Sequence, residues 1–246
     1  MSVDPAMLGH FKHHYVARLE LFVSVFKERF LGAFGSLEEE VQAVSDGAWA
    51  QWCGHPYHES GVDPSIAAGD ALQIGVDYFS SLMGARQAYI NLAAVGLYHA
   101  WEQQVLEFFR RYVIGEARRC DVSAISLVEF ERVAERAGVR IKDFPSASVI
   151  KTLRLCANTV KHAEGPSALQ LRKRRPDLFV HPGTHAEETR SVMASRTIYA
   201  PLSGDDLYVT DRHLDEFLAG TIQYWTDMTQ TLLTDFKGEW FPVAGP

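Results

Sequence analysis

The stretch GARQAYINLAAVGLYHAWEQQVLEFFRRYVI, residues 84–114, decides the fold class of this chain. Its large apolar residues recur at steps of three or four, and an α-helix turns once in about 3.6 residues. This spacing lines them along one side of a helix, which predicts a long helix with a buried apolar stripe. The residues of that stripe are Leu97, Trp101, Val105, Phe108 and Tyr112.

Helical patterns of the same kind extend on both sides of this stretch. Gly35 interrupts the pattern near the N-terminus, and Ser36 followed by Glu39 is typical of a capping box. Pro64 suits the first turn of the helical stretch that leads into residue 84. The other helices are expected over 5–34, 37–53, 127–137, 146–165 and 212–236.

The sequence therefore predicts an all-α protein, a helical bundle with long antiparallel helices. Residues 180–210 are the exception, because mixed polar residues and short β-type runs there predict a small irregular or β excursion, with a hairpin near Gly204. We expect one domain over 1–246, in which 1–63 form an N-terminal helical extension and 64–246 form the core.

The composition indicates an ordered globular protein, since 47% of the residues are hydrophobic and 22% are charged. A net charge of -7 argues against a protein that coats nucleic acid generally. The stretch from Lys151 to Arg175 is different, because it holds seven Lys or Arg residues and a single acid, Glu164. Such a local excess can steer a polyanion to one place on the surface.

The cysteines and the apolar runs indicate in which cellular compartment the protein is expected. Cys53, Cys120 and Cys156 are odd in number and far apart, which favours free thiols in a reducing environment. The first residues lack a signal-peptide hydrophobic core, and no apolar run approaches the roughly 20 residues that span a bilayer. We expect a cytoplasmic protein without a membrane partner.

Two histidine groups could in principle hold a metal. His55, His58 and Glu59 lie close together, but Gly54 and Pro56 place them in a loop outside the helical HExxH register. Another group lies near the N-terminus, where two of three histidines are four residues apart without an acid beside them. We expect neither a metal site nor a cofactor. The residues of the second group are His10, His13 and His14.

The segment KTLRLCANTVKH, residues 151–162, is the strongest candidate for chemistry. In a helix five of its polar residues fall within an arc of about 100°, namely Lys151, Arg154, Asn158, Lys161 and His162. Histidine can act as a general acid or base, and cations stabilise the charge of a phosphate in the transition state. A solvated helix face has the same pattern, so both interpretations stay open. The candidate catalytic residues here are Lys161 and the ridge of Arg154, Asn158 and His162, of which the three ridge residues could reach one phosphate.

Two further groups complete the candidate site. Glu102 borders the apolar stripe, where a partly buried acid needs a partner. It either orients His162 or Arg154 or is a structural acid. The basic run near residue 173 is expected to contact an RNA backbone, with a solvated face or a dimer interface as the alternative. The predicted RNA-binding residues are Lys151, Arg172, Lys173, Arg174 and Arg175.

The run LCANTVKH, residues 155–162, resembles the signature helix of the HEPN superfamily, with Asn158 and His162 as its Asn-x3-His core. The following RPDLF, residues 175–179, and the earlier LYHAWE, residues 97–102, are similar to elements of HEPN-like proteins of bacterial defence and toxin systems. The resemblance covers about 85–240, and the signature itself spans some ten residues.

This resemblance implies an all-α, commonly dimeric and often metal-independent ribonuclease, whose site forms where two copies of this helix meet. His162 would be the general acid or base and Asn158 would position the scissile group. The family pattern has an arginine just before the Asn, where this chain has Ala157. Arg154 or Lys161 could take its place, and without such a cation the protein would either bind RNA without cutting it or serve only as a partner.

Our hypothesis is an endoribonuclease of bacterial defence or of a toxin–antitoxin system, which uses 2′-hydroxyl attack. Its expected partners are a second copy, an RNA substrate and an antitoxin or defence-system protein. The alternative is a non-catalytic helical scaffold or regulator that binds a protein partner or RNA. A nucleotide or small-molecule sensor that uses the same face is a third interpretation.

Overall fold

The computed structural model describes residues 5–54, 63–114, 125–182, 197–234, 236 and 240, except for the side chains of residues 5–7 and His10. The α-helices are α1 (Pro5–Val25), α2 (Leu37–Cys53), α3 (Pro64–Phe108), α4 (Leu127–Arg136), α5 (Ala147–His162), α6 (Pro166–Arg174) and α8 (Asp211–Thr234). Shorter π and 3-10 turns are η1 (Phe26–Phe30), η2 (Leu31–Phe34), η4 (Phe109–Ile114), η6 (Ile141–Asp143) and η7 (Pro176–Phe179). None of the described residues forms a strand, which confirms the all-α fold class.

Side-chain caps fix where several helices begin. Asp63 accepts a hydrogen bond from the Ser65 amide at 2.9 Å, with Pro64 in the first turn of α3. Ser126 caps α4 in the same way, through the Glu129 amide. The capping box predicted for α2 was wrong, because the Ser36 hydroxyl makes no cap bond and instead bonds the Glu40 carboxylate at 3.0 Å.

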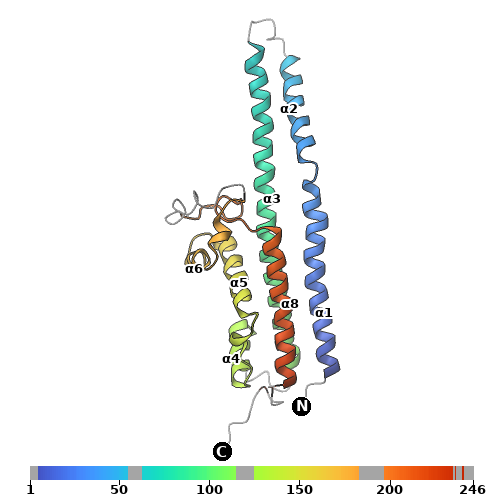
Figure 1. Ribbon diagram of the computed structural model, residues 1–246, viewed down its shortest axis with the longest axis vertical. Helices are drawn as coiled ribbons and strands as arrows, with labels where there is room; N and C mark the ends of the chain where they lie inside the picture. The colour runs from blue at the N-terminus through green and yellow to red at the C-terminus, as the bar shows by residue number, and fades with distance from the viewer. Residues whose placement is uncertain are drawn as a thin grey trace, which may run out of the picture.

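The hydrophobic core surrounds the C-terminal half of α3, against which α1, α5 and α8 pack (Figure 1). Four residues of the predicted stripe, Leu97 to Phe108, are buried, and Tyr112 is half-buried in η4. Gln104 ties three helices together: its amide nitrogen donates to the Tyr15 carbonyl, and its oxygen accepts from Trp225 Nε1. The helix predicted from this sequence pattern is therefore the centre of the bundle.

A two-helix arm extends beyond the core. We define the arm as α2 with residues 64–83 of α3, and Figure 1 shows it projecting past the end of α8 as an antiparallel hairpin. Small residues of α3, such as Ala71 and Gly75, face α2, and no residue of α2 is buried. Helix α1 belongs instead to the core, with Tyr15 and Leu19 almost fully enclosed.

The predicted excursion near 180–210 is irregular where it is described, and residues 183–196 lie outside the described residues. Asn91 of α3 organises residues 197–210: its side chain donates to the Pro201 and Leu207 carbonyls and accepts from the Val209 amide. These bonds satisfy backbone groups that a strand ladder would otherwise use, so the predicted hairpin is absent from these residues. Gly204 occupies a left-handed turn at φ 84°.

Candidate functional site

Helix α5 is held on the core by both its start and its inner face. The backbone amide and hydroxyl of Ser146, just before the helix, donate to Asp227 of α8 at 3.1 and 2.7 Å. The inner residues Leu153, Cys156 and Val160 are at most 3% exposed. Because one face of α5 is fixed in this way, its opposite face is directed to solvent.

The outer face of α5 is polar, as the sequence predicts. The cations and the histidine on it are exposed, whereas Asn158 is half-buried. Within the described parts of the chain, none of the five polar residues that make up this outer face forms a hydrogen bond or an ion pair. Their polar atoms are thus free to meet a ligand. The five residues of this outer face are Lys151, Arg154, Asn158, Lys161 and His162.

Ala157 explains where a catalytic cation can stand. It is 0% exposed, so an arginine at this position would carry its charge into the core. Arg154 lies one turn earlier on the solvent side. If α5 carries a phosphate-binding arginine, the fold permits it at 154 and not at 157.

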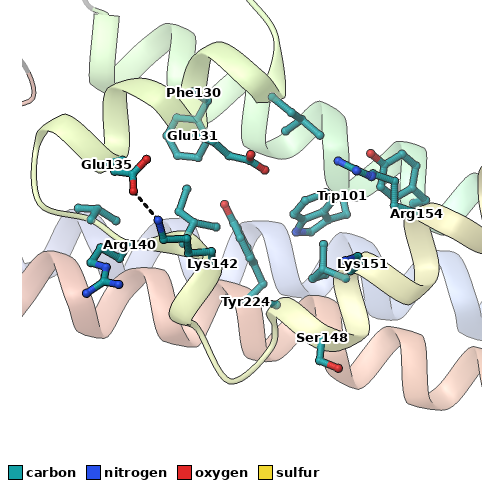
Figure 2. A pocket seen from close by; sticks show the side chains of 16 residues that line it. Trp101, Phe130, Glu131, Glu135, Arg140, Lys142, Ser148, Lys151, Arg154 and Tyr224 are labelled. Atoms are coloured by element: carbon teal, nitrogen blue, oxygen red, sulfur yellow. Dashed lines mark hydrogen bonds and ion pairs between the residues drawn. The ribbon is translucent and has the colours of Figure 1, made fainter. Parts of the chain in front are cut away.

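A cavity of about 560 Å³ opens beside the first half of this face (Figure 2). Lys151 and Arg154 line it, together with residues of α3, α4 and α8. Lys161 and His162, at the end of α5, are not among its lining residues. The outer face of α5 is therefore divided into a part that borders the cavity and a part in open solvent.

Two hydrogen-bond donors of cavity-lining residues have no acceptor within the described residues, and one of them, Trp101 Nε1, is itself closed off from solvent. Trp101 Nε1 is buried and unpartnered, and its ring meets Tyr224 edge-on at 5.0 Å between centroids. The Tyr224 hydroxyl is directed toward Glu131 and Lys142 in Figure 2 and likewise makes no hydrogen bond. Burial, helped by the charge of Glu131, raises the pKa of Tyr224, so its hydroxyl keeps its proton.

Charged residues line the rim of the cavity. Lys142 forms an ion pair with Glu135 at 2.5 Å, drawn as a dashed line in Figure 2. Arg140 pairs with Asp143 at 2.8 Å. Lys151 and Arg154 are unpaired, as described above, so they are the cations that an anionic ligand would meet in this cavity.

Glu102 does not make the predicted contact with His162 or Arg154. It accepts a hydrogen bond from the Tyr98 hydroxyl at 3.2 Å and lies 3.8 Å from His99 Nδ1, both on α3 itself. Burial and the nearby Glu102 raise the pKa of Tyr98, whereas the charge of Arg154 opposes this. Tyr98, which lines the cavity, thus lies between Glu102, to which it donates a hydrogen bond, and the charge of Arg154.

The basic run of α6 is mostly engaged in structure. Arg175 pairs with Asp177 and Glu216, and Arg174 donates to Thr152 at 2.8 Å and to Ser148. Arg172 lies over the Phe179 ring at 5.0 Å. Within the described residues Lys173 alone of the four makes no such contact, so it is the predicted RNA-binding residue of this run most available to a phosphate.

The remaining histidine and cysteine candidates give little support for a metal site or a reactive thiol. The described residues hold no group of three metal-ligating side chains, and residues 55–62, with Cys120, lie outside them. Burial raises the pKa of the Cys156 thiol to about 12, which leaves it unreactive near neutral pH. Cys53 is exposed, as are His13 and His14. Across the described ranges, no helix has the length and apolarity to cross a membrane.

The sequence pattern missed Tyr224 and Trp101 as cavity residues. Both follow the periodicity of buried helix faces, and periodicity does not distinguish a cavity wall from a filled core. Comparison of the chain with protein-family models, with curated proteins and with solved structures finds no match.

Proposed function

We propose that this chain is a metal-independent endoribonuclease of the HEPN type, which acts as a homodimer through the outer face of α5. The observation that carries the proposal is this face itself, where three cations, an amide and an imidazole make no hydrogen bond or ion pair within the described part of the chain. Unpaired cations on the same face as a histidine provide what cleavage of a phosphodiester requires.

In the proposed reaction the 2′-oxygen of the RNA attacks the adjacent phosphorus. The new O2′–P bond forms as the P–O5′ bond breaks, which leaves a 2′,3′-cyclic phosphate and a free 5′-hydroxyl. His162 of one copy takes the proton of the 2′-hydroxyl, and a water molecule gives a proton to the leaving 5′-oxygen. Arg154 stabilises the charge on the phosphate, with Lys161 beside the reacting group, and Asn158 positions it.

The split of the α5 face supports a site composed of two copies. Arg154 and His162 are eight residues apart, which is about 12 Å along a helix. Arg154 borders the cavity and His162 does not, so one copy does not bring them together at one phosphate. Two copies with antiparallel α5 helices would place each arginine beside the other copy's histidine.

The cavity is suited to an unstacked base of the bound strand. The Tyr224 hydroxyl offers a donor to a ring nitrogen or a carbonyl oxygen, and Glu131 can accept from an exocyclic amine. Lys151 and Arg154 stand where the attached phosphate would lie. Tyr224→Phe, which removes only the hydroxyl, is expected to weaken RNA binding while the protein stays folded.

The decisive experiment incubates the purified protein with 5′-labelled RNA in EDTA. Cleavage with cyclic-phosphate ends is expected for the wild type and is expected to be lost in His162→Ala. His13→Ala, which removes an exposed histidine of α1, is the matched control and should cleave normally. Undiminished cleavage by His162→Ala would show that the proposed mechanism is wrong.

Expression in growing bacteria gives a second readout. A cytoplasmic ribonuclease of a defence or toxin–antitoxin system should slow growth when overproduced, and His162→Ala should relieve this effect. Light scattering should give the mass of a dimer. An antitoxin or another defence-system protein would be the natural partner that restrains the activity in the cell.

One observation favours the alternative of a protein that binds RNA without cutting it. Ala157 occupies the position of the family's arginine, and its burial prevents a side chain there from reaching a phosphate. In that case Arg154→Ala would weaken RNA binding and reduce its salt dependence, while the wild type would leave the labelled RNA intact.

A further inference from the structure

We propose that the arm is a docking surface for a basic amphipathic helix of a partner protein. This proposal does not depend on whether α5 cleaves RNA. It rests on two properties of the arm: large apolar side chains that the chain itself leaves uncovered, and an acidic charge without any cation.

The arm exposes an unusual amount of apolar surface. Isolated exposed apolar residues are common on proteins, but contiguous ones mark an interaction site. Leu72 is 65% exposed and Phe79 is 42% exposed, although both lie on the longest helix of the described chain. The exposed large apolar residues of the arm are Trp49, Ile66, Leu72, Ile74, Val76, Phe79 and Met83.

Four of them form one seam. Leu72, Val76, Phe79 and Met83 follow one another at steps of four, three and four, the spacing by which two helices pack side by side. Seven and fourteen residues after Met83, on the same side of α3, stand Ile90 and Leu97, which are buried in the core. The seam is thus the continuation of a helix-packing face, and along the arm the described residues leave it uncovered.

The charge of the arm identifies the partner's chemistry. No lysine or arginine occurs between Arg29 and Arg86, in a chain that holds 24 of them. On α3, Asp70 and Asp77 lie roughly opposite the seam around the helix, so they leave the apolar contact clear. The acidic residues of the arm are Glu38, Glu39, Glu40, Asp46, Asp70 and Asp77.

This charge decides among the possible occupants. A second copy would bring the six acidic residues of its own arm near those of the first, and an anionic membrane surface would also repel the arm. A partner helix with leucine-type residues at the seam spacing would cover the apolar seam. Lysine or arginine residues beside those leucines would balance the acidic charge of the arm. The seam from Leu72 to Met83 spans eleven residue steps, or about 17 Å, which is about three turns of the bound helix.

A designed peptide tests the proposal directly. The probe is a fluorescein-labelled 18-residue helix of leucine and lysine, and the reference is the same peptide with glutamate in place of lysine. Fluorescence anisotropy with the full chain should show binding of the lysine peptide only. Binding should weaken as salt rises, since attraction between opposite charges contributes to it.

Matched variants separate the seam from the charge. The double variant Leu72→Gln with Phe79→Gln keeps every charge and should weaken lysine-peptide binding at least about tenfold, because two apolar side chains no longer contribute. Leu169→Gln, at an equally exposed leucine of α6, should leave binding unchanged. Circular dichroism should show the same helix content in all three proteins.

Three outcomes would overturn the proposal. The first is equal binding of the lysine and glutamate peptides. The second is undiminished binding by the double variant. The third is a dimer of the wild type that the double variant dissociates, since a second copy would then occupy the seam. Loss of RNA cleavage in His162→Ala together with unchanged peptide binding would separate this proposal from the proposed function.

Discussion

The two halves of α3 carry the same pattern with opposite results. Leu72 and Leu97 lie on the same side of the helix, yet the first is 65% exposed and the second is fully buried. Around Leu97 the helices α1, α5 and α8 complete a bundle, whereas around Leu72 the described chain supplies α2 alone, on another side. Burial along a helix thus depends on its neighbours, even where its own pattern is continuous.

The largest expected effect comes from truncating the two leucines. Leu97→Ala should lower the free energy of unfolding by about 2 to 5 kcal/mol, because it leaves a cavity in the core. Leu72→Ala should change it by less than about 0.5 kcal/mol, as for other exposed residues. Urea denaturation measures both, and equal effects would mean that the arm is covered in solution.

Two glycine substitutions are expected to change stability in opposite directions in the core and in the arm. A β-carbon at Gly220 of α8 would collide with Val149 of α5, so Gly220→Ala should destabilise the core by about 1 to 3 kcal/mol. Gly47 in the arm has open space, and Gly47→Ala should stabilise α2 by about 0.5 to 1 kcal/mol. Thermal unfolding gives both signs; a stabilising Gly220→Ala would contradict the close packing of α5 on α8.

The folding stability of the core is expected to depend on pH through His213. Burial, reinforced by Arg175, lowers the pKa of His213, and the facing Asp177 and Glu216 offset this only in part. The folded state therefore favours the neutral imidazole relative to the unfolded chain, where the pKa is about 6.5. The resulting stability is complete above that pH and is lost as pH falls through the lower folded pKa.

The variant His213→Gln tests this directly. Free energies of unfolding measured between pH 8 and pH 5 should fall for the wild type and fall less steeply for the variant. Parallel curves for the two proteins would show that His213 does not contribute.

The smallest effect concerns the surface. Lys27 pairs with Asp215 at 2.6 Å and links η1 to α8, but the aspartate is 61% exposed. Lys27→Ala should cost about 0 to 1 kcal/mol, and less at high salt. A larger loss in urea denaturation would mean that this pair holds α1 on the core more firmly than its exposure indicates.

Much of the helical framework could be predicted from sequence, because helix signals are local. The steps between Leu97 and Phe108 and the proline at residue 64 act within one or two turns. The candidate site was predicted less completely. The sequence indicated that the cations, Asn158 and His162 of α5 share one side, but it assigned Arg175 to RNA, whereas distant Glu216 pairs with it. The cavity beside Arg154 was not predicted, since Trp101 and Tyr224 come from helices far apart in the sequence.

The sequence by itself determined that the chain is helical, which side of α3 is apolar, and that α5 has a polar side with a histidine at its end. Only the tertiary structure decided that the apolar side is covered along one half of α3, that Arg154 borders a cavity and that His162 does not. The physical reason is range: helix periodicity depends on residues three or four positions apart. Burial and ion pairing depend instead on residues that only folding brings together.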